Sequence, residues 1–294
     1  MRTDFSTWKK YDGANEGSGR SEKIWLRNPN DGQIGLFKYK KDIETKDHVS
    51  EKLASDIASI LNLPCAKIEI GTYKDNEGSM SYLINAKNEM LIEGISFINQ
   101  IYPNYNAQDM YDKSSNEYYS LEMIVNSIKE YGLLQDLLKM LVFDFLIGNS
   151  DRHQNNWALI SAGDGKYRFS PLYDNSSSLC CYILEDKIPS YLGKDLNRLK
   201  SIVTTKSLSI VRLDKMQKKR PTHQAIFAYL WNRFECEIEE FVYLIKVKIN
   251  ANTIRDIVSS YDELLLSAER KKLISLFLLE KTKSLSNMIE RKEE

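Results

Sequence analysis

The first third of the chain alternates between apolar and polar positions, which predicts β-strands separated by short turns. The tripeptides at 30–32 (Asn-Asp-Gly) and 76–78 (Asn-Glu-Gly) are typical of hairpin turns, and each lies between segments rich in strand-forming side chains. The predicted extended segments are residues 22–27, 35–40, 66–73, 80–86 and 90–98. We therefore expect the chain to begin with a β-rich part.

One helix is predicted within this part, and helices predominate after it. Between residues 49 and 61 apolar side chains recur every three or four positions, and Pro64 ends the helix. The most apolar helix covers residues 133–146 and stops at a Gly-Asn pair. A short hairpin is predicted around residues 157–169, and the chain is mostly helical from about residue 194 onward.

The change from strands to helices near residues 84–120 predicts an α+β fold with two lobes. We expect residues 1–95 to form a small, β-rich N-lobe. Residues 96–294 then form a mostly helical C-lobe.

Composition and charge exclude several classes of protein. Hydrophobic residues make up 42% and charged residues 28% of the chain, which is typical of a globular protein and not of a disordered one. The 41 basic and 41 acidic residues balance, so the net charge gives no support for nonspecific binding to nucleic acid or membranes. The four cysteines lack the spacing of a zinc site or a disulfide framework.

The N-terminal residues are polar and contain no apolar signal region. The apolar stretches fall short of the ~20 residues that span a bilayer. We expect a cytoplasmic protein without a membrane partner, or an effector secreted without a signal peptide.

The strongest chemical signal is the loop at 149–156, Asn-Ser-Asp-Arg-His-Gln-Asn-Asn, followed by a Tyr-Asp pair at 173–174. Phosphoryl transfer needs a carboxylate near the accepting hydroxyl, and Asp151 is the candidate base. Magnesium needs oxygen ligands, which Asn156 and Asp174 supply. Asp174 follows Asn156 across a short hairpin that can place the two residues at one metal site. An isolated Asp in a turn is usually structural, but the ordered set favours catalysis.

His153 lies inside this loop and has two interpretations. Its imidazole can fix the shape of the loop by hydrogen bonding to nearby backbone, or it can take part in catalysis. We favour the structural role, because a base for a hydroxyl must lie near the metal-bound phosphate and Asp151 fits that position better. His153 is kept as a second catalytic candidate.

At these residues the chain resembles the HipA-like serine/threonine protein kinases. The Asn, Asp, His and Asn of their catalytic-loop pattern are matched here by Asn149, Asp151, His153 and Asn156. The loop also resembles that of the phosphatidylinositol kinases, whereas the Tyr-Asp pair favours the HipA side. The resemblance implies a two-lobed, protein-kinase-like fold with a nucleotide-binding N-lobe. The C-lobe then carries the catalytic loop at 149–156 and the metal motif at 172–174. ATP and Mg²⁺ are the implied cofactors.

The same resemblance implies nucleotide-binding residues upstream. Gly17, Ser18 and Gly19 match a mobile phosphate-binding loop. Lys38 matches a strand lysine that pairs with the α- and β-phosphates. Glu51 can orient this lysine by an ion pair, although a solvated helix residue is an equally good interpretation. The adenine-binding linker is expected near Leu83 and Asn85.

Some HipA-like kinases autophosphorylate serines of the phosphate-binding loop, which makes Ser18 and Ser21 candidates here. Full-length members carry an N-terminal subdomain that this sequence lacks, so the chain is similar to the compact members and to split toxin systems. The resemblance implies a protein substrate with a Ser or Thr acceptor and, in a toxin system, an antitoxin partner. A translation factor or an aminoacyl-tRNA synthetase is the implied substrate, with nucleic acid involved only through a bound tRNA.

Two other functions remain open from the residues alone. One is a lipid or small-molecule kinase, and the other is a non-catalytic ATP-binding protein. A basic stretch after the motif is either a solvated surface or a site for an acidic substrate or RNA. Its members are Lys206, Arg212, Lys215, Lys218, Lys219 and Arg220.

Overall fold

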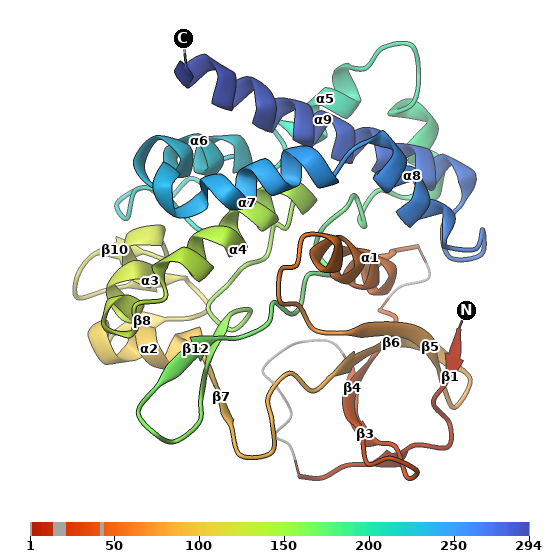
Figure 1. The fold of residues 1–294 in the computed structure, drawn as a ribbon, viewed down its shortest axis with the longest axis horizontal. Coiled ribbons are helices and arrows are strands. Elements are labelled where there is room, and N and C mark those ends of the chain that lie inside the picture. Colours follow the sequence, from red (N-terminus) through yellow and green to blue (C-terminus); the bar gives the residue numbers. More distant parts are fainter. Residues whose placement is uncertain (1, 14–21, 42–43, 294) are drawn as a thin grey trace.

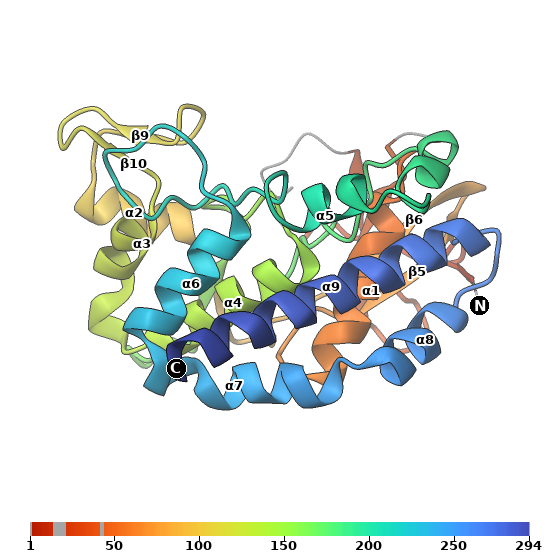
Figure 2. The same ribbon diagram turned by 90° about the horizontal axis from the view of Figure 1, so that it is seen from above.

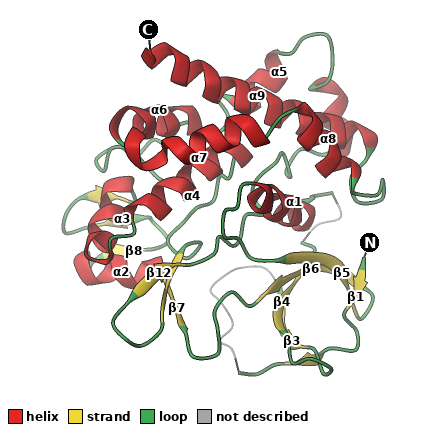
Figure 3. Ribbon diagram, viewed as in Figure 1, coloured by secondary structure: helices red, strands yellow, loops and turns green. Residues whose placement is uncertain are grey.

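The computed structural model describes residues 2–13, 22–41 and 44–293 and has the α+β architecture predicted from the sequence. A curled sheet occupies the N-terminal part, and the C-terminal part is helical (Figures 1 and 3). The order of the strands in the sheet is β1–β5–β6–β4–β3–β2. These strands are β1 (Thr3–Asp4), β2 (Lys9–Lys10), β3 (Lys23–Arg27), β4 (Ile34–Tyr39), β5 (Ile68–Tyr73) and β6 (Asn76–Tyr82).

The two faces of the sheet carry different residues, because successive side chains of a strand point to opposite sides. Phe37 of β4 packs with Leu26 and Met80 in a small core inside the curl of the sheet. Lys38, the next residue, lies on the other face, opposite Ser79 of β6 in the strand register. Strand alternation therefore directs Lys38 away from the small core.

Helix α1 (Asp47–Ile60) lies between the sheet and the helical part (Figure 1). It is hydrogen bonded to segments that come much later in the chain. Ser50 Oγ donates to the Ser178 carbonyl at 3.1 Å, and Asp56 accepts from the Tyr261 hydroxyl at 2.6 Å. The backbone N–H of Lys46, just before α1, donates to the Cys181 carbonyl at 3.3 Å.

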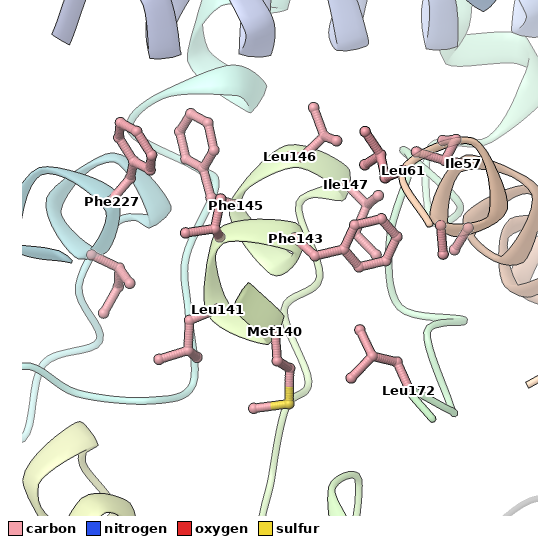
Figure 4. Packing of buried hydrophobic residues seen from close by; sticks show 14 of the residues in the cluster. Ile57, Leu61, Met140, Leu141, Phe143, Phe145, Leu146, Ile147, Leu172 and Phe227 are labelled. Carbon is pink, nitrogen blue, oxygen red and sulfur yellow. The ribbon is translucent and has the colours of Figure 1, made fainter. Parts of the chain in front are cut away.

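The helical part is built around α4 (Leu134–Ile147), which is apolar and buried along most of its length. Figure 4 shows Phe227 of α6 on one side of α4 and Ile57 and Leu61 of the α1 region on the other. Figure 2 shows the long helix α9 crossing the same part of the molecule. The remaining helices are α2 (Gly94–Ile101), α3 (Leu121–Ile128), α5 (Asn197–Val203), α6 (His223–Arg233), α7 (Glu235–Lys248), α8 (Ala251–Ser259) and α9 (Ala268–Glu293), with short 3₁₀ turns at Lys129–Tyr131 and Glu185–Ser190.

Two small sheets complete the fold. One has the order β12–β11–β7 and joins β7 (Met90–Glu93) to the hairpin of β11 (Ala158–Ser161) and β12 (Tyr167–Phe169). The other consists of β8 (Tyr105–Asn106), β9 (Tyr111–Asp112) and β10 (Glu117–Tyr118). The first sheet connects a strand of the N-terminal third directly to the segment that precedes Asp174.

Two local predictions were wrong. The turn expected at 76–78 lies at Lys74 and Asp75, which both have positive φ, and residues 76–78 belong to β6. The extended segment expected at 90–98 ends at Glu93 and continues as α2. Asn and Gly are strong turn formers, but Asp also tolerates a positive φ. The pairing of β5 with β6 set the register of the hairpin and so placed the turn two residues earlier.

Candidate active site

The catalytic-loop candidate begins where α4 ends. Gly148 has φ +67°, the left-handed conformation that closes many helices and that glycine adopts without strain. The side chain of Asn149 then holds the loop on both sides. Its Nδ2 donates to Asp144 Oδ1 at 3.0 Å, and its Oδ1 accepts from the backbone N–H of Asp151 at 3.2 Å.

Arg152 is a buried centre of hydrogen bonds beneath this loop. Its Nε and Nη2 donate to the two carboxylate oxygens of Asp144 at 2.9 and 2.7 Å, and both side chains are almost fully buried. Its Nη1 donates to the carbonyls of Asn156 at 2.6 Å and Tyr173 at 3.1 Å. Because one nitrogen contacts both carbonyls, the end of the loop and the residue before Asp174 lie side by side.

Asn156 and Asp174 present oxygen atoms suited to a divalent cation. Asn156 Nδ2 donates to the Asp151 carbonyl at 2.7 Å, which fixes the orientation of the amide and identifies Oδ1 as its acceptor atom. Asp174 has φ +54°, and its side chain remains more than one third exposed. A carboxylate and an amide oxygen are a donor set that fits Mg²⁺.

Lys38 connects the sheet to this motif. Its Nζ lies 2.6 Å from Glu51 Oε1 and 3.2 Å from Asp174 Oδ1. Glu51 is 2% exposed, and its second oxygen accepts from Ser79 Oγ at 3.2 Å. Residues 38, 51 and 174, which are far apart in the sequence, therefore meet at one point.

The charged side chains that meet here shift one another's pKa values. Burial lowers the pKa of Lys38, but the carboxylates of Asp174 and Glu51 outweigh it, so the pKa lies above its usual value. Burial raises the pKa of Asp174, whereas the charge and hydrogen bond of Lys38 lower it, to about 2 overall. Lys38 is thus protonated and Asp174 ionised at neutral pH.

Asp151 has a different environment. Burial raises the pKa of its carboxyl group above the usual value, and the negative charge of Asp174 acts in the same direction. The neighbouring His153, Arg220 and Lys41 side chains oppose this increase of the pKa. A carboxylate with a raised pKa is better suited to accept a proton than one with a pKa near 2.

His153 hydrogen bonds to its own loop. Its backbone N–H donates to the Asp151 carbonyl at 2.9 Å, and its Nδ1 accepts from the Asn155 backbone N–H at 3.2 Å. These contacts are those expected of a residue that fixes the shape of the loop. Its participation in catalysis stays a prediction.

The upstream predictions fall partly outside the described residues. Gly17, Ser18, Gly19 and Ser21 lie there, so the phosphate-binding loop is not placed. In the expected linker, the Leu83 N–H donates to the Ile34 carbonyl at 3.0 Å, and Asn85 Nδ2 donates to the Glu89 carbonyl at 2.8 Å. The Leu83 bond continues the pairing of β6 with β4, and the Asn85 bond holds the turn between β6 and β7. The contact of these two residues with adenine stays a prediction.

Sequence reasoning missed a second buried network behind the loop, between α6 and α9. His223 Nε2 lies 2.8 Å from the Asn149 carbonyl, and its Nδ1 lies 2.9 Å from Ser207 Oγ. Lys281 Nζ, fully buried on α9, donates to Ser207 Oγ at 2.8 Å. A carbonyl only accepts, so His223 donates through Nε2 and accepts from the Ser207 hydroxyl through Nδ1. The one feature of the sequence that could have indicated this network is Lys281, which occupies an apolar position of the C-terminal helix.

This network predicts a pH dependence of stability. Burial lowers the pKa of Lys281 to about 7, whereas an unfolded chain has the ordinary value of 10.5. Between these two values the unfolded chain binds more protons, so raising the pH stabilises the fold. The contribution of Lys281 to the free energy of unfolding is expected to rise by about 2 kcal/mol from pH 7 to pH 9.

Urea unfolding of the wild type and Lys281→Met at both pH values measures this contribution as the difference between the two proteins. Lys283→Met, an exposed change two residues away on α9, is the control and should follow the wild type. An equal pH dependence in the wild type and Lys281→Met would contradict the prediction.

The two-part fold and the charged groups that meet at Lys38 define a protein of the kinase-like class. Residues 17–235 match the family model of the HipA-like C-terminal domain, and the chain belongs to this family. The family is a kinase family, and the resemblance found in the sequence is confirmed. No match was found among curated protein sequences.

Two solved structures share the fold. A Helicobacter pylori proinflammatory kinase, CtkA, has a TM-score of 0.82 and 20% sequence identity, with 99% of each chain covered. HipA in the HipA, HipB and operator DNA complex of the Shewanella oneidensis MR-1 toxin–antitoxin system has a TM-score of 0.55 and 12% identity. That match covers 94% of this chain and 66% of HipA. At such identities the likeness concerns the fold.

Proposed function

We propose that the protein is an ATP- and Mg²⁺-dependent serine/threonine protein kinase of the HipA type. One observation carries the proposal. Lys38, paired with Glu51, contacts Asp174, while Arg152 holds the loop of Asp151 and Asn156 against the residue before Asp174. Phosphoryl transfer requires this combination of a phosphate-binding cation, oxygen ligands for a metal and a base.

The proposed roles follow from these positions. Lys38 binds the α- and β-phosphates, with Glu51 fixing its direction, and the loop of Gly17–Gly19 covers the phosphates. Asn156 and Asp174 hold Mg²⁺, which neutralises the charge that develops on the phosphates. Asp151 orients the Ser or Thr hydroxyl and accepts its proton. In this proposal residues 1–95 are the nucleotide-binding lobe and residues 96–294 the catalytic lobe.

The partner and the location are proposed from the family. One solved structure of similar fold is a HipA bound to HipB and operator DNA, which supports an antitoxin partner and a growth-arresting role for this chain. A protein substrate, free or carrying tRNA, and a cytoplasmic or secreted location complete the proposal. Within residues 2–13, 22–41 and 44–293, no helix is both long and apolar enough to cross a membrane.

The test is transfer of labelled γ-phosphate. Purified protein, first treated with a phosphatase, is incubated with labelled ATP and Mg²⁺, alone and with cell lysate, and mass spectrometry identifies labelled residues. We expect Mg²⁺-dependent label on Ser or Thr of a lysate protein, and on Ser18 or Ser21 if the loop autophosphorylates. Label confined to lipids or small molecules would contradict a protein kinase, and ATP binding without transfer would indicate a binding protein.

A further inference from the structure

Arg220 reaches the catalytic loop from a segment 70 residues further along the chain. Its Nη2 donates to the carbonyls of Ser150 at 2.5 Å and Leu208 at 3.1 Å, and its Nε donates to the Ser209 carbonyl at 3.1 Å. The Ser150 carbonyl belongs to the peptide group whose N–H is that of Asp151. Since a peptide group is planar, a contact to this carbonyl restrains the backbone of Asp151 directly.

The neighbouring peptide is held from the same segment. His223 Nε2 donates to the Asn149 carbonyl at 2.8 Å, so Arg220 and His223 bind two successive carbonyls of the loop. We call residues 220–223 the carbonyl clamp. Bonds to Asn149 and Ser150 from one short segment fix both the position and the rotation of the peptides that lead into Asp151.

The clamp has a rigid support of its own. An antiparallel bridge joins Thr222 to Leu208. The Ser209 N–H donates to the Pro221 carbonyl at 2.9 Å, and the His223 N–H donates to the Ser207 carbonyl at 2.8 Å. Pro221 also fixes its own φ angle. The segment therefore has little freedom with which to follow a movement of the loop.

The other atoms of the Asp151 backbone are held from within the site. Its N–H donates to Asn149 Oδ1, and its carbonyl accepts from Asn156 Nδ2 and from the His153 N–H. The Ser150 carbonyl is the remaining polar atom of the peptide that leads into Asp151, and Arg220 contacts it. The guanidinium group also lies close enough to the Asp151 carboxylate for their charges to attract each other.

We propose that Arg220 is a positioning residue for phosphoryl transfer, which fixes the Ser150–Asp151 peptide so that the Asp151 carboxylate points at the acceptor hydroxyl. This inference rests on the proposed function of Asp151. Arg220 belongs to the basic stretch, for which the sequence left two interpretations, a solvated surface or a site for an acidic substrate or RNA. The inference gives this residue a specific task instead. Displacing a reacting group by about 1 Å costs on the order of 100-fold in rate.

The test compares Arg220→Met, Arg220→Lys and Arg255→Met. Methionine preserves most of the side-chain length without donors, and lysine preserves the charge without the fork of donors that reaches three carbonyls. Arg255, an exposed residue of α8 outside the basic stretch, is the matched control for loss of one positive charge. Steady-state kinetics, ATP affinity by calorimetry and far-UV circular dichroism are measured for each protein.

We expect kcat to fall by about 10- to 100-fold in Arg220→Met and by less in Arg220→Lys, with Arg255→Met equal to the wild type. The KM and affinity for ATP should stay within about twofold, because the clamp binds the backbone that leads into Asp151 and not the proposed phosphate-binding residue Lys38. If Arg220→Met does not fold, the kcat of folded Arg220→Lys decides the question.

Three results would overturn the inference. One is a wild-type kcat in folded Arg220→Met, or in Arg220→Lys if the methionine variant is unfolded. Another is a loss of activity that follows the loss of ATP affinity. The third is an inactive wild type, which would contradict the proposed function itself. The wild-type measurement alone separates this outcome from the other two.

Discussion

Asp151→Asn is expected to lower kcat for phosphoryl transfer by about 10²- to 10⁴-fold, with ATP affinity nearly unchanged. An amide cannot accept the proton of the substrate hydroxyl. The loop should keep its shape, because the hydrogen bonds that hold Asp151 involve its backbone N–H and carbonyl and not its carboxylate. Single-turnover transfer of labelled phosphate at saturating ATP measures the chemical step.

Asp164→Asn is the matched control, since it makes the same substitution in the exposed turn between β11 and β12. It should retain the wild-type rate. If Asp151→Asn transfers phosphate as fast as the wild type, the base lies elsewhere, and His153→Gln would then test the alternative candidate in the same loop.

Arg152→Met is expected to have the largest effect on stability and to lower the free energy of unfolding by about 3–5 kcal/mol. The change leaves the Asp144 carboxylate buried without its cation, with only Asn149 Nδ2 among its side-chain donors in the described residues. It also frees the carbonyls of Asn156 and Tyr173. Urea unfolding followed by circular dichroism and tryptophan fluorescence measures the effect.

Arg168→Met provides the matched control. Arg168 also donates to a carboxylate, that of Glu89, through Nε and Nη2, but its side chain is 47% exposed. Breaking such an exposed pair costs less than about 1 kcal/mol. Similar losses in the two variants would show that burial does not determine the strength of the Arg152–Asp144 pair.

The sequence predicted the fold and several members of the site for a physical reason. Hydrophobic periodicity determines helices and strands, and the loop residues Asp151 and Asn156 lie close together in the chain. For Glu51 the sequence left an ion pair with Lys38 and a solvated helix position equally open. The ion pair is present at 2.6 Å, because strand alternation and the helical repeat direct both side chains to one place. Their catalytic roles remain proposals.

The supporting contacts could not be predicted in the same way. Arg152 and Asp144 join a polar loop to an apolar helix, and nothing in the local pattern indicates that the loop folds back on that helix. Arg220 and His223 act on the loop from 70 and 74 residues away, so only the tertiary structure reveals them. The missed helix α2 and the displaced turn at 74–75 likewise depend on which partners pack against them.

The hydrogen bonds of α1 have a mechanical consequence. The helix is joined to residues 178, 181 and 261 of the helical part, and the residues on either side of Cys65 exchange backbone hydrogen bonds with Leu172. Glu51 of the same helix accepts from Ser79 Oγ of β6, so α1 is bonded to the sheet as well. A swing of the sheet against the helical part would therefore require hydrogen bonds on one side of α1 to break. The distances from Lys38 to Glu51 and to Asp174 would then show which side had given way.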